Sequence, residues 1–363
     1  MTDRRSPLHE VQEAAGAEFY WEDGWPWAMK FSDDVLREYE AIRTATGLWD
    51  LFSTIKYEVR GPDAGRFVQR RATNDLSTMQ VGQVRYSAFV NADGTMVDDG
   101  NTYKLADDRF WVMINSAGLE DWFRESGGDL DATVEDVTEQ NPMISIQGPT
   151  SRDVLGSVTE GDLSSLGWFR FSPEPMKVAG ADALVLRTGF SGELGYEVVT
   201  DPASIGGVWN ALVEAGGTPF GLDAVDLARV EAGLIIIAVD YQPGETSPWD
   251  LSMDRFIKTD TENVGAKALA EVGQAPQRRF KTLRIEADAP PEAGAEVTKD
   301  GEPVGTVTSP AASPRLGTIG LAILRADAAD DGEKVEVAVE GGTAPATVDV
   351  LSLYDPQKQK PRS

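Results

Sequence analysis

Two adjacent carboxylates, Asp98 and Asp99, interrupt the segment TMVDDGNTY (95–103), which otherwise has the composition of a β-strand. Aspartate is disfavoured in the middle of strands, so the pair needs an explanation. Neighbouring side chains of a strand point to opposite faces, and at most one of the two can therefore enter a given pocket. The segment is compatible with a solvated edge or bulge. It is equally compatible with a buried carboxylate that meets a cationic or NH-bearing ligand.

A second polar stretch, RTGFSGELGYE (187–197), carries three glycines at three-residue spacing. A dinucleotide-binding loop needs G-x-G-x-x-G between a strand and a helix, and a Walker loop needs Gly-Lys-Ser/Thr. Here the segment EVV that follows reads as another strand. We therefore predict a hairpin turn with polar side chains around it, among them Glu197, and no phosphate loop.

The chain has no cysteine and one histidine, His9. Cysteine nucleophiles, disulfides, and cysteine-ligated zinc or iron–sulfur sites are thereby excluded. A Ser-His-Asp triad or a histidine-rich metal site is not expected, and we predict no metal. His9 itself is interpreted as a surface or cap residue. Acid–base chemistry would depend on carboxylates, tyrosine, lysine or a bound cofactor.

Two further segments could take part in binding. FYWEDGWPWAMKF (19–31) is dense in aromatic residues, which usually form core but can also cage a quaternary ammonium or sulfonium cation. GLDAVDLARVEAGL (221–234) has helical spacing, with Asp226 and Arg229 placed for an ion pair. On spacing alone, Arg229 and Glu231 are predicted to lie on a solvated face.

Composition narrows the class of protein. The 363 residues are 41% hydrophobic with a net charge of −27, and the acidic residues are spread along the chain. This charge argues against nucleic-acid binding, and it indicates a hydrated acidic surface, as in proteins from a salt-loving organism or an acid-biased proteome. No apolar run approaches the ~18 residues of a membrane span, and MTDRRSPLHEVQE has no apolar signal-peptide core. A soluble cytoplasmic protein without a membrane partner is expected.

These residues need a scaffold, and the periodicity of the chain predicts one of the α+β class. After residues 271–279 the pattern changes to short strands separated by Gly, Pro and Asp, which predicts a C-terminal barrel or small sandwich of about 85 residues. The final PQKQKPRS is expected to fray. We predict helices over 33–47, 62–72, 118–128, 202–217 and 221–234, and strands at 55–61, three within 82–115, 142–149 and a hairpin within 176–200.

Several motifs occur in an order that resembles the aminomethyltransferase family, which comprises the glycine cleavage T-protein and folate-dependent demethylases. The motifs include GWP (24–26), EYEAIRTATGLWD (38–50), YSAFVNADGTMVDDG (86–100), RTGFSGELGYE, GLDAVDLARVEAGL and TSPAASPRLGTIGLA (308–322). The resemblance implies a three-domain cloverleaf with tetrahydrofolate in a central cavity. The implied domains are 1–50 plus 140–235, 51–139 plus 236–277, and a β-barrel over 278–363.

The resemblance also implies roles for individual residues. Asp99 matches the catalytic aspartate of the family, and Glu197 matches the glutamate that accepts hydrogen bonds from the pterin ring. Arg229 matches an arginine at the folate site, where a cation would suit the glutamate tail. The implied folate-binding set is Tyr86, Asp99, Asn115, Phe190, Glu197 and Arg229.

Departures from the family pattern bear on the substrate. DLFSTIKYE (50–58) replaces a DVSHMG-like segment, Gly100 replaces leucine, and IIIAVDYQPGETSPWD (235–250) replaces a YGQDMDE-like run. They predict a demethylase that transfers a methyl group from a small N-, S- or O-methyl compound, preferably a sulfonium or ammonium cation, to give 5-methyltetrahydrofolate. The substrate residues would be Tyr20, Trp25, Trp27 and Tyr241.

Two alternatives stay open. A glycine cleavage T-protein would act with a lipoyl H-protein as its partner. A non-catalytic folate-binding module resembles the relatives that assist iron–sulfur assembly, but their cysteine-containing motif is AVDYQPGE here.

Overall fold

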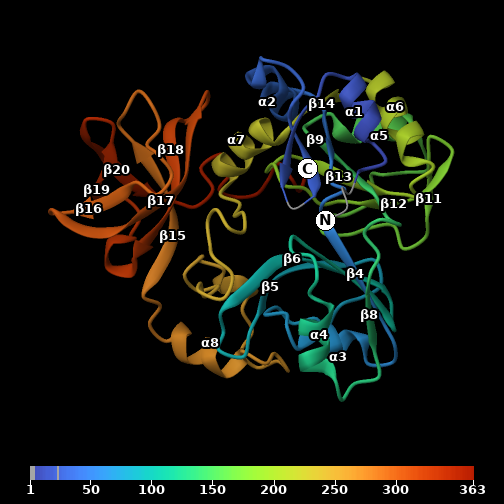
Figure 1. Cartoon of the computed structure of the whole chain (residues 1–363), viewed down its shortest axis with the longest axis horizontal. Coiled ribbons are helices and arrows are strands. Elements are labelled where there is room, and N and C mark those ends of the chain that lie inside the picture. Colours follow the sequence, from blue (N-terminus) through green and yellow to red (C-terminus); the bar gives the residue numbers. More distant parts are fainter. Residues whose placement is uncertain (1–4, 23) are drawn as a thin grey trace.

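The computed structural model describes residues 5–22 and 24–363. Within them, the strands form a small hairpin, a seven-stranded sheet, a five-stranded sheet and a closed six-stranded barrel. Figure 1 shows the barrel on one side, the seven-stranded sheet with its helices on the other, and the five-stranded sheet below them. Helix α7 (Leu222–Ala232) lies between the barrel and the seven-stranded sheet. The predicted α+β class and the C-terminal barrel are confirmed.

The seven-stranded sheet has one face covered by helices α1 (His9–Ala14), α5 (Ser151–Ser157) and α6 (Ile205–Glu214). Alternate residues of its central strands enter this core, as Ile144 and Ile146 do. The other face packs on α2 (Val35–Thr44), on α7 and on the five-stranded sheet. Its strands are, in spatial order, β10 (Thr159–Glu160), β11 (Met176–Val178), β12 (Ala181–Leu186), β13 (Gly195–Val199), β9 (Met143–Gln147), β3 (Gly47–Asp50) and β14 (Thr218–Pro219).

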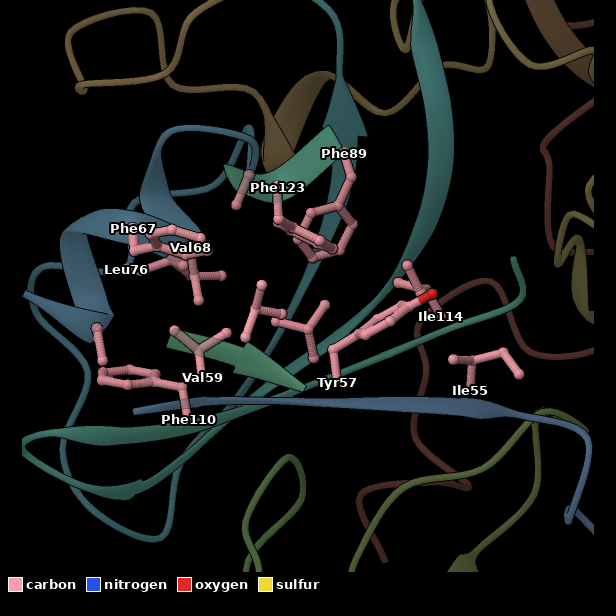
Figure 2. Close-up of a cluster of buried hydrophobic side chains, with 14 of the residues drawn as sticks. Ile55, Tyr57, Val59, Phe67, Val68, Leu76, Phe89, Phe110, Ile114 and Phe123 are labelled. Atoms are coloured by element: carbon pink, nitrogen blue, oxygen red, sulfur yellow. The ribbon is translucent and has the colours of Figure 1, made fainter. Parts of the chain in front are cut away.

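The five-stranded sheet is antiparallel throughout. Helices α3 (Ala64–Gln69) and α4 (Glu120–Gly127) close a core against one face, and Figure 2 shows Tyr57, Phe89 and Phe123 converging there. Side chains of the opposite face, such as Tyr103 and Trp111, join the core shared with the seven-stranded sheet. The strands run in the order β5 (Val84–Val90), β6 (Met96–Ala106), β7 (Arg109–Ile114), β4 (Ile55–Arg60) and β8 (Thr133–Asp136).

The barrel is reached through η1 (Asp254–Phe256) and α8 (Ala266–Gly273). Its interior is filled by alternate aliphatic residues, for example Val335 and Val337 of one strand. The barrel includes a further short helix, η2 (Ala326–Ala328). The strands close in the order β15 (Arg278–Ile285), β18 (Gly317–Arg325), β17 (Glu302–Ser313), β16 (Glu296–Lys299), β19 (Lys334–Val339) and β20 (Gly342–Asp349).

The two open sheets are built from separate parts of the chain, which is compatible with the predicted three domains. The boundaries of these domains stay a prediction. The seven-stranded sheet uses strands between 47–50 and 143–219, and the five-stranded sheet uses strands between 55 and 136. None of the helices in the described part of the chain is long and apolar enough to cross a membrane.

Two expectations at the ends of the chain are wrong. His9 is buried, and its ring packs on Phe19 at 4.4 Å, because the N-terminal segment forms a helix that covers the sheet. The predicted frayed end is docked instead. The carbonyl oxygen of Ser363 accepts hydrogen bonds from Arg152, at 2.7 Å, and from Arg187, which directly follows strand β12 of the seven-stranded sheet.

Candidate functional site

Asp98 and Asp99 are both buried in β6, and their side chains make different contacts. Asp98 accepts hydrogen bonds from the backbone N–H groups of Asn115 and Ser116, at 3.0 and 2.7 Å, and from the Asn115 side chain at 2.8 Å. It therefore holds the turn that follows β7. Asp99, 8% exposed, faces elsewhere. The expected burial is confirmed for both carboxylates, whereas a ligand contact and a catalytic role of Asp99 stay predictions.

Two tyrosines hold Asp99 between them. The hydroxyl of Tyr86, in β5, donates to Oδ2 at 2.7 Å, and the hydroxyl of Tyr241 donates to Oδ1 at 2.6 Å. The ring of Tyr86 packs edge-on against Phe256, with centroids 5.0 Å apart. The structure thus brings three of the predicted site residues into direct contact: Tyr86 and Asp99 lie on neighbouring strands of one sheet, and Tyr241 comes from the loop after α7.

The charge of this group is set by burial. Burial, together with the neighbouring charge of Asp98, raises the pKa of Asp99 to about 7, while the two tyrosine hydrogen bonds oppose the rise. Burial and the charge of Asp99 raise the pKa of both Tyr86 and Tyr241, so their hydroxyls remain donors at neutral pH. A carboxylate that titrates near neutrality and is shielded from water is suited to stabilise a cation or to exchange a proton.

Glu197 is buried in β13 and accepts a hydrogen bond on Oε2 from the Thr188 hydroxyl at 2.5 Å. No described residue donates to its other oxygen, Oε1, which leaves that oxygen able to accept an N–H group. Burial raises the pKa of Glu197, and the Thr188 hydrogen bond and the charge of Lys56 lower it. Lys56 is itself buried, with its ammonium group donating to the Thr54 carbonyl at 2.8 Å. Burial lowers the pKa of Lys56 to about 8.

The glycine-rich segment before Glu197 encloses the side chain of Gln147. A Cβ atom at Gly189 or Gly195 would lie 2.2 or 2.4 Å from the Gln147 amide. Ser191 donates to Gln147 Oε1 at 2.7 Å, and Gln147 donates to Ser145 at 3.0 Å. The segment is a turn, as predicted, and its close glycines make room for a polar side chain. Phe190 extends from the same turn and is partly exposed.

Gly195→Ala is expected to destabilise the protein by about 1–3 kcal/mol, because Gln147 must move and leave buried polar groups unpaired. Urea denaturation measures the change. Gly207→Ala is the matched control, since Gly207 lies in α6 with open space around it and alanine there should be neutral or stabilising. Equal effects of the two substitutions would contradict the role assigned to the contact with Gln147.

Arg229 is fully buried in α7, so the predicted solvated face is wrong for Arg229 and also for Glu231. Arg229 makes the predicted ion pair with Asp226 at 2.8 Å, and it pairs with Asp240 at 2.6 Å. Its Nη2 donates to Ser309 of the barrel at 2.7 Å. These contacts engage all three nitrogens of the guanidinium group. A contact between Arg229 and folate stays a prediction.

Glu231, two residues after Arg229 on α7, is the centre of a second buried network. It accepts hydrogen bonds from Arg43, at 2.7 and 2.9 Å, from Tyr39 at 2.7 Å, and from Ser313 of the barrel. Arg43 also contacts Glu193 at 3.2 Å. The sequence carried no local signal for this network, since its members are far apart along the chain.

The aromatic segment forms the hairpin of β1 (Glu18–Glu22) and β2 (Trp25–Lys30). Tyr20 is paired with Trp27, so Tyr20, Trp25 and Trp27 share one face of the hairpin. Their surroundings differ: Trp25 is buried against Phe52, whereas Tyr20 is 55% exposed. Their role in substrate binding stays a prediction.

The remaining predicted residue, Asn115, uses its side chain to brace Asp98 and lies on the surface. Sequence reasoning did not identify Asp240, Ser309, Thr188 or Lys56 as site residues. The one available signal was the departure from the family pattern in 235–250, which contains both Asp240 and Tyr241. In the described residues, no group of three or more acidic or histidine side chains could hold a metal ion.

Comparisons with known proteins identify the family of the chain. Residues 8–261 match the family model "GCVT N-terminal domain", and residues 278–355 match "Glycine cleavage T-protein C-terminal barrel domain". A probable aminomethyltransferase of Haloarcula marismortui is 36% identical over 355 residues, covering 94% of this chain and 96% of the relative. An aminomethyltransferase of Rubrobacter xylanophilus is 35% identical over 367 residues, covering 99% and 96%.

A solved structure extends the match to three dimensions. The glycine cleavage system aminomethyltransferase T from Bartonella henselae aligns with a TM-score of 0.89 and 25% identity, over 98% of this chain and 99% of that one. Sequence and fold therefore agree along nearly the whole chain. The protein belongs to the glycine cleavage T-protein family of one-carbon transferases, enzymes that use tetrahydrofolate.

Proposed function

We propose that this enzyme is an aminomethyltransferase, which moves the one-carbon unit of an aminomethylated lipoyl H-protein to tetrahydrofolate. The observation that carries the proposal is Asp99, a buried carboxylate with a pKa of about 7 held by two tyrosine hydroxyls. The names of the relatives in Haloarcula marismortui and Rubrobacter xylanophilus support the aminomethyl reaction. The demethylase predicted from the sequence has no such support among them, and it becomes the second candidate.

The residues present suit a pterin. Its ring offers adjacent N–H groups, and Glu197 offers a buried carboxylate whose Oε1 receives no hydrogen bond from the described residues. Phe190 and Tyr86 supply aromatic surface at the two sheets. Tetrahydrofolate, when bound, supplies the nucleophilic N5 atom.

The protein then supplies position and charge. Glu197 would orient the pterin, and Asp99 would stabilise positive charge on the one-carbon unit as it is transferred. The hydroxyls of Tyr86 and Tyr241 donate to both oxygens of Asp99, which favours its ionised form. This chemistry requires neither cysteine nor histidine.

A demethylase stays the alternative because of one observation. The segment 235–250, which departs from the family pattern, places Tyr241 directly on Asp99. A substrate that approaches Asp99 in this protein therefore meets a phenol from that segment. Such a difference is compatible with a small methylated substrate instead of a lipoyl arm.

The two reactions give different products, which makes the test direct. The purified enzyme is incubated with tetrahydrofolate and either an aminomethylated lipoyl H-protein or a panel of N-, S- and O-methyl compounds. We expect ammonia and methylenetetrahydrofolate from the H-protein. Formation of 5-methyltetrahydrofolate from the panel, without ammonia from the H-protein, would favour the demethylase. Folate binding, measured as a thermal shift, with no product from either substrate would indicate a non-catalytic folate-binding module.

A further inference from the structure

A compact turn over residues 236–241 follows the helix α7 and carries the consecutive residues Asp240 and Tyr241. The backbone N–H of Asp240 donates to the Ile236 carbonyl at 2.8 Å, and that of Ala238 donates to the Tyr241 carbonyl at 2.8 Å. Ala238 has a φ of 63°, a left-handed conformation that alanine adopts rarely. The surrounding contacts must hold this conformation, so the turn has a defined shape.

Asp240 anchors the turn to two other parts of the protein. Its Oδ2 accepts from Arg229 of α7 at 2.6 Å and from the Ile236 N–H at 2.9 Å. Its Oδ1 accepts from Thr308 and Ser309 of the barrel strand β17, at 2.5 and 2.7 Å. Asp240 is 1% exposed, so these are buried, charge-assisted contacts.

Tyr241, the next residue, reaches the third part. Its side chain is buried, and its hydroxyl donates to Oδ1 of Asp99 in the five-stranded sheet at 2.6 Å. Asp240 and Tyr241 thereby join α7, the barrel and β6 at one point. The carboxylate proposed for catalysis is thus connected to the barrel through two adjacent residues.

We propose that Tyr241 is a positioning residue for Asp99, held in register by the contacts of Asp240 with Arg229 and Ser309. The proposal rests on the role of Asp99 in the proposed function. The hydroxyl of Tyr241 fixes the orientation of the carboxylate and favours its ionised form. Asp240 determines where that hydroxyl lies.

The groups around Asp99 give the direction of the effect. Burial raises the pKa of Asp99, the charges of Asp98 and Asp240 raise it further, and the hydroxyls of Tyr241 and Tyr86 lower it. The charge of Arg255 lowers the pKa of Tyr86. Removing the Tyr241 hydroxyl removes one of the two lowering contacts. The pKa of Asp99 should therefore rise above about 7.

Tyr241→Phe tests the proposal in the folate-free protein. The side-chain carboxyl carbon of Asp99 is followed by NMR in protein labelled with ¹³C at aspartate, and the signal is assigned by its absence in Asp99→Asn. In the variant the titration midpoint of Asp99 should rise by about one pH unit, which corresponds to about fivefold less carboxylate at pH 7. The pH–rate profile of transfer should move to higher pH by the same amount, with activity recovered above the new midpoint.

Tyr196→Phe is the matched control. It removes a hydroxyl of the same kind from another buried tyrosine, one that accepts a hydrogen bond from Arg152 at 2.9 Å and has no contact with Asp99. In Tyr196→Phe, the titration midpoint of the Asp99 carboxyl should equal that of the wild-type protein. An unchanged midpoint in Tyr241→Phe would overturn the proposal.

Ser309→Ala gives an independent measurement if Tyr241→Phe folds poorly. It removes one donor to Asp240 from the barrel and leaves Tyr241 intact, so a smaller shift of the Asp99 midpoint in the same direction is expected. No shift in Ser309→Ala would overturn the anchoring role of Asp240. Full activity of Asp99→Asn would instead refute the role of Asp99 in the proposed function, and the NMR midpoints would still decide whether Tyr241 acts on Asp99.

Discussion

Asp99→Asn is expected to lose most turnover, by at least about a hundredfold, while tetrahydrofolate still binds. Asparagine keeps the shape of the side chain and removes the charge that would stabilise the transferred group. The pterin contact assigned to Glu197 does not involve this charge. The rate is measured with the substrate that gives product in the wild-type enzyme, and folate binding is measured by calorimetry.

The same substitution should make the protein more stable at alkaline pH. A carboxyl with a pKa of about 7 when folded and 3.8 when unfolded weakens folding by about 4 kcal/mol once both states are ionised. This penalty is absent below pH 4, grows as the pH rises towards 7, and is complete above it. Asp99→Asn removes the penalty, and the gain should exceed the loss of one tyrosine hydrogen bond.

Melting temperatures at pH 5 and pH 8 provide the check. In the absence of folate, the melting temperature of Asp99→Asn minus that of the wild-type protein should be larger at pH 8 than at pH 5. A difference in melting temperature that does not depend on pH would mean that Asp99 is not a buried carboxyl with a raised pKa. Undiminished turnover would remove Asp99 from the reaction.

Removing one partner of the Arg43–Glu231 pair should destabilise the fold by about 3–5 kcal/mol. Both side chains are fully buried, and the carboxylate also accepts from Tyr39 and from Ser313 of the barrel. In Glu231→Leu, the buried guanidinium of Arg43 keeps the ion pair with Glu193 and loses the pair with Glu231. In Arg43→Met, the buried carboxylate of Glu231 loses its cation. The double variant should cost less than the sum, because neither charge is then left unpaired.

Denaturant unfolding of the two single variants and the double variant measures the coupling. Glu40→Ala is the comparison, because Glu40 pairs with Arg315 at 2.7 Å on a partly exposed surface, where such pairs contribute about 0–1 kcal/mol. Single variants as mild as Glu40→Ala would show that this network does not stabilise the junction between the barrel and α2.

Local regularities in the sequence predicted much of the scaffold. Alternation predicted the strands that became β4, β5, β6 and β7, and helical spacing predicted α2 and α6. These patterns reflect which side of one element faces the core, and a few neighbouring residues contain that information. The hairpin β1–β2 and the helix α1 were missed, since their aromatic and polar residues do not follow a clear period.

The residues with buried charge show the limit of such reasoning. The spacing of Asp226 and Arg229 predicted their ion pair, but it gave no indication that Arg229 would also meet Asp240 and Ser309. Spacing within a helix describes neighbours one turn away. Contacts that close between a helix, a later turn and a barrel depend on how whole elements are stacked.

The sequence by itself determined the kind of chemistry. It excluded cysteine chemistry, left one histidine, and placed Asp98 and Asp99 on opposite faces of a strand, because pleating is a local property of the backbone. Only the tertiary structure decided which aspartate is buried between hydroxyls and how its charge is controlled. Tyr86 lies 13 residues from Asp99 and Tyr241 lies 142 residues away, and the pKa of a carboxyl depends on burial and on neighbours in space, whatever their separation along the chain.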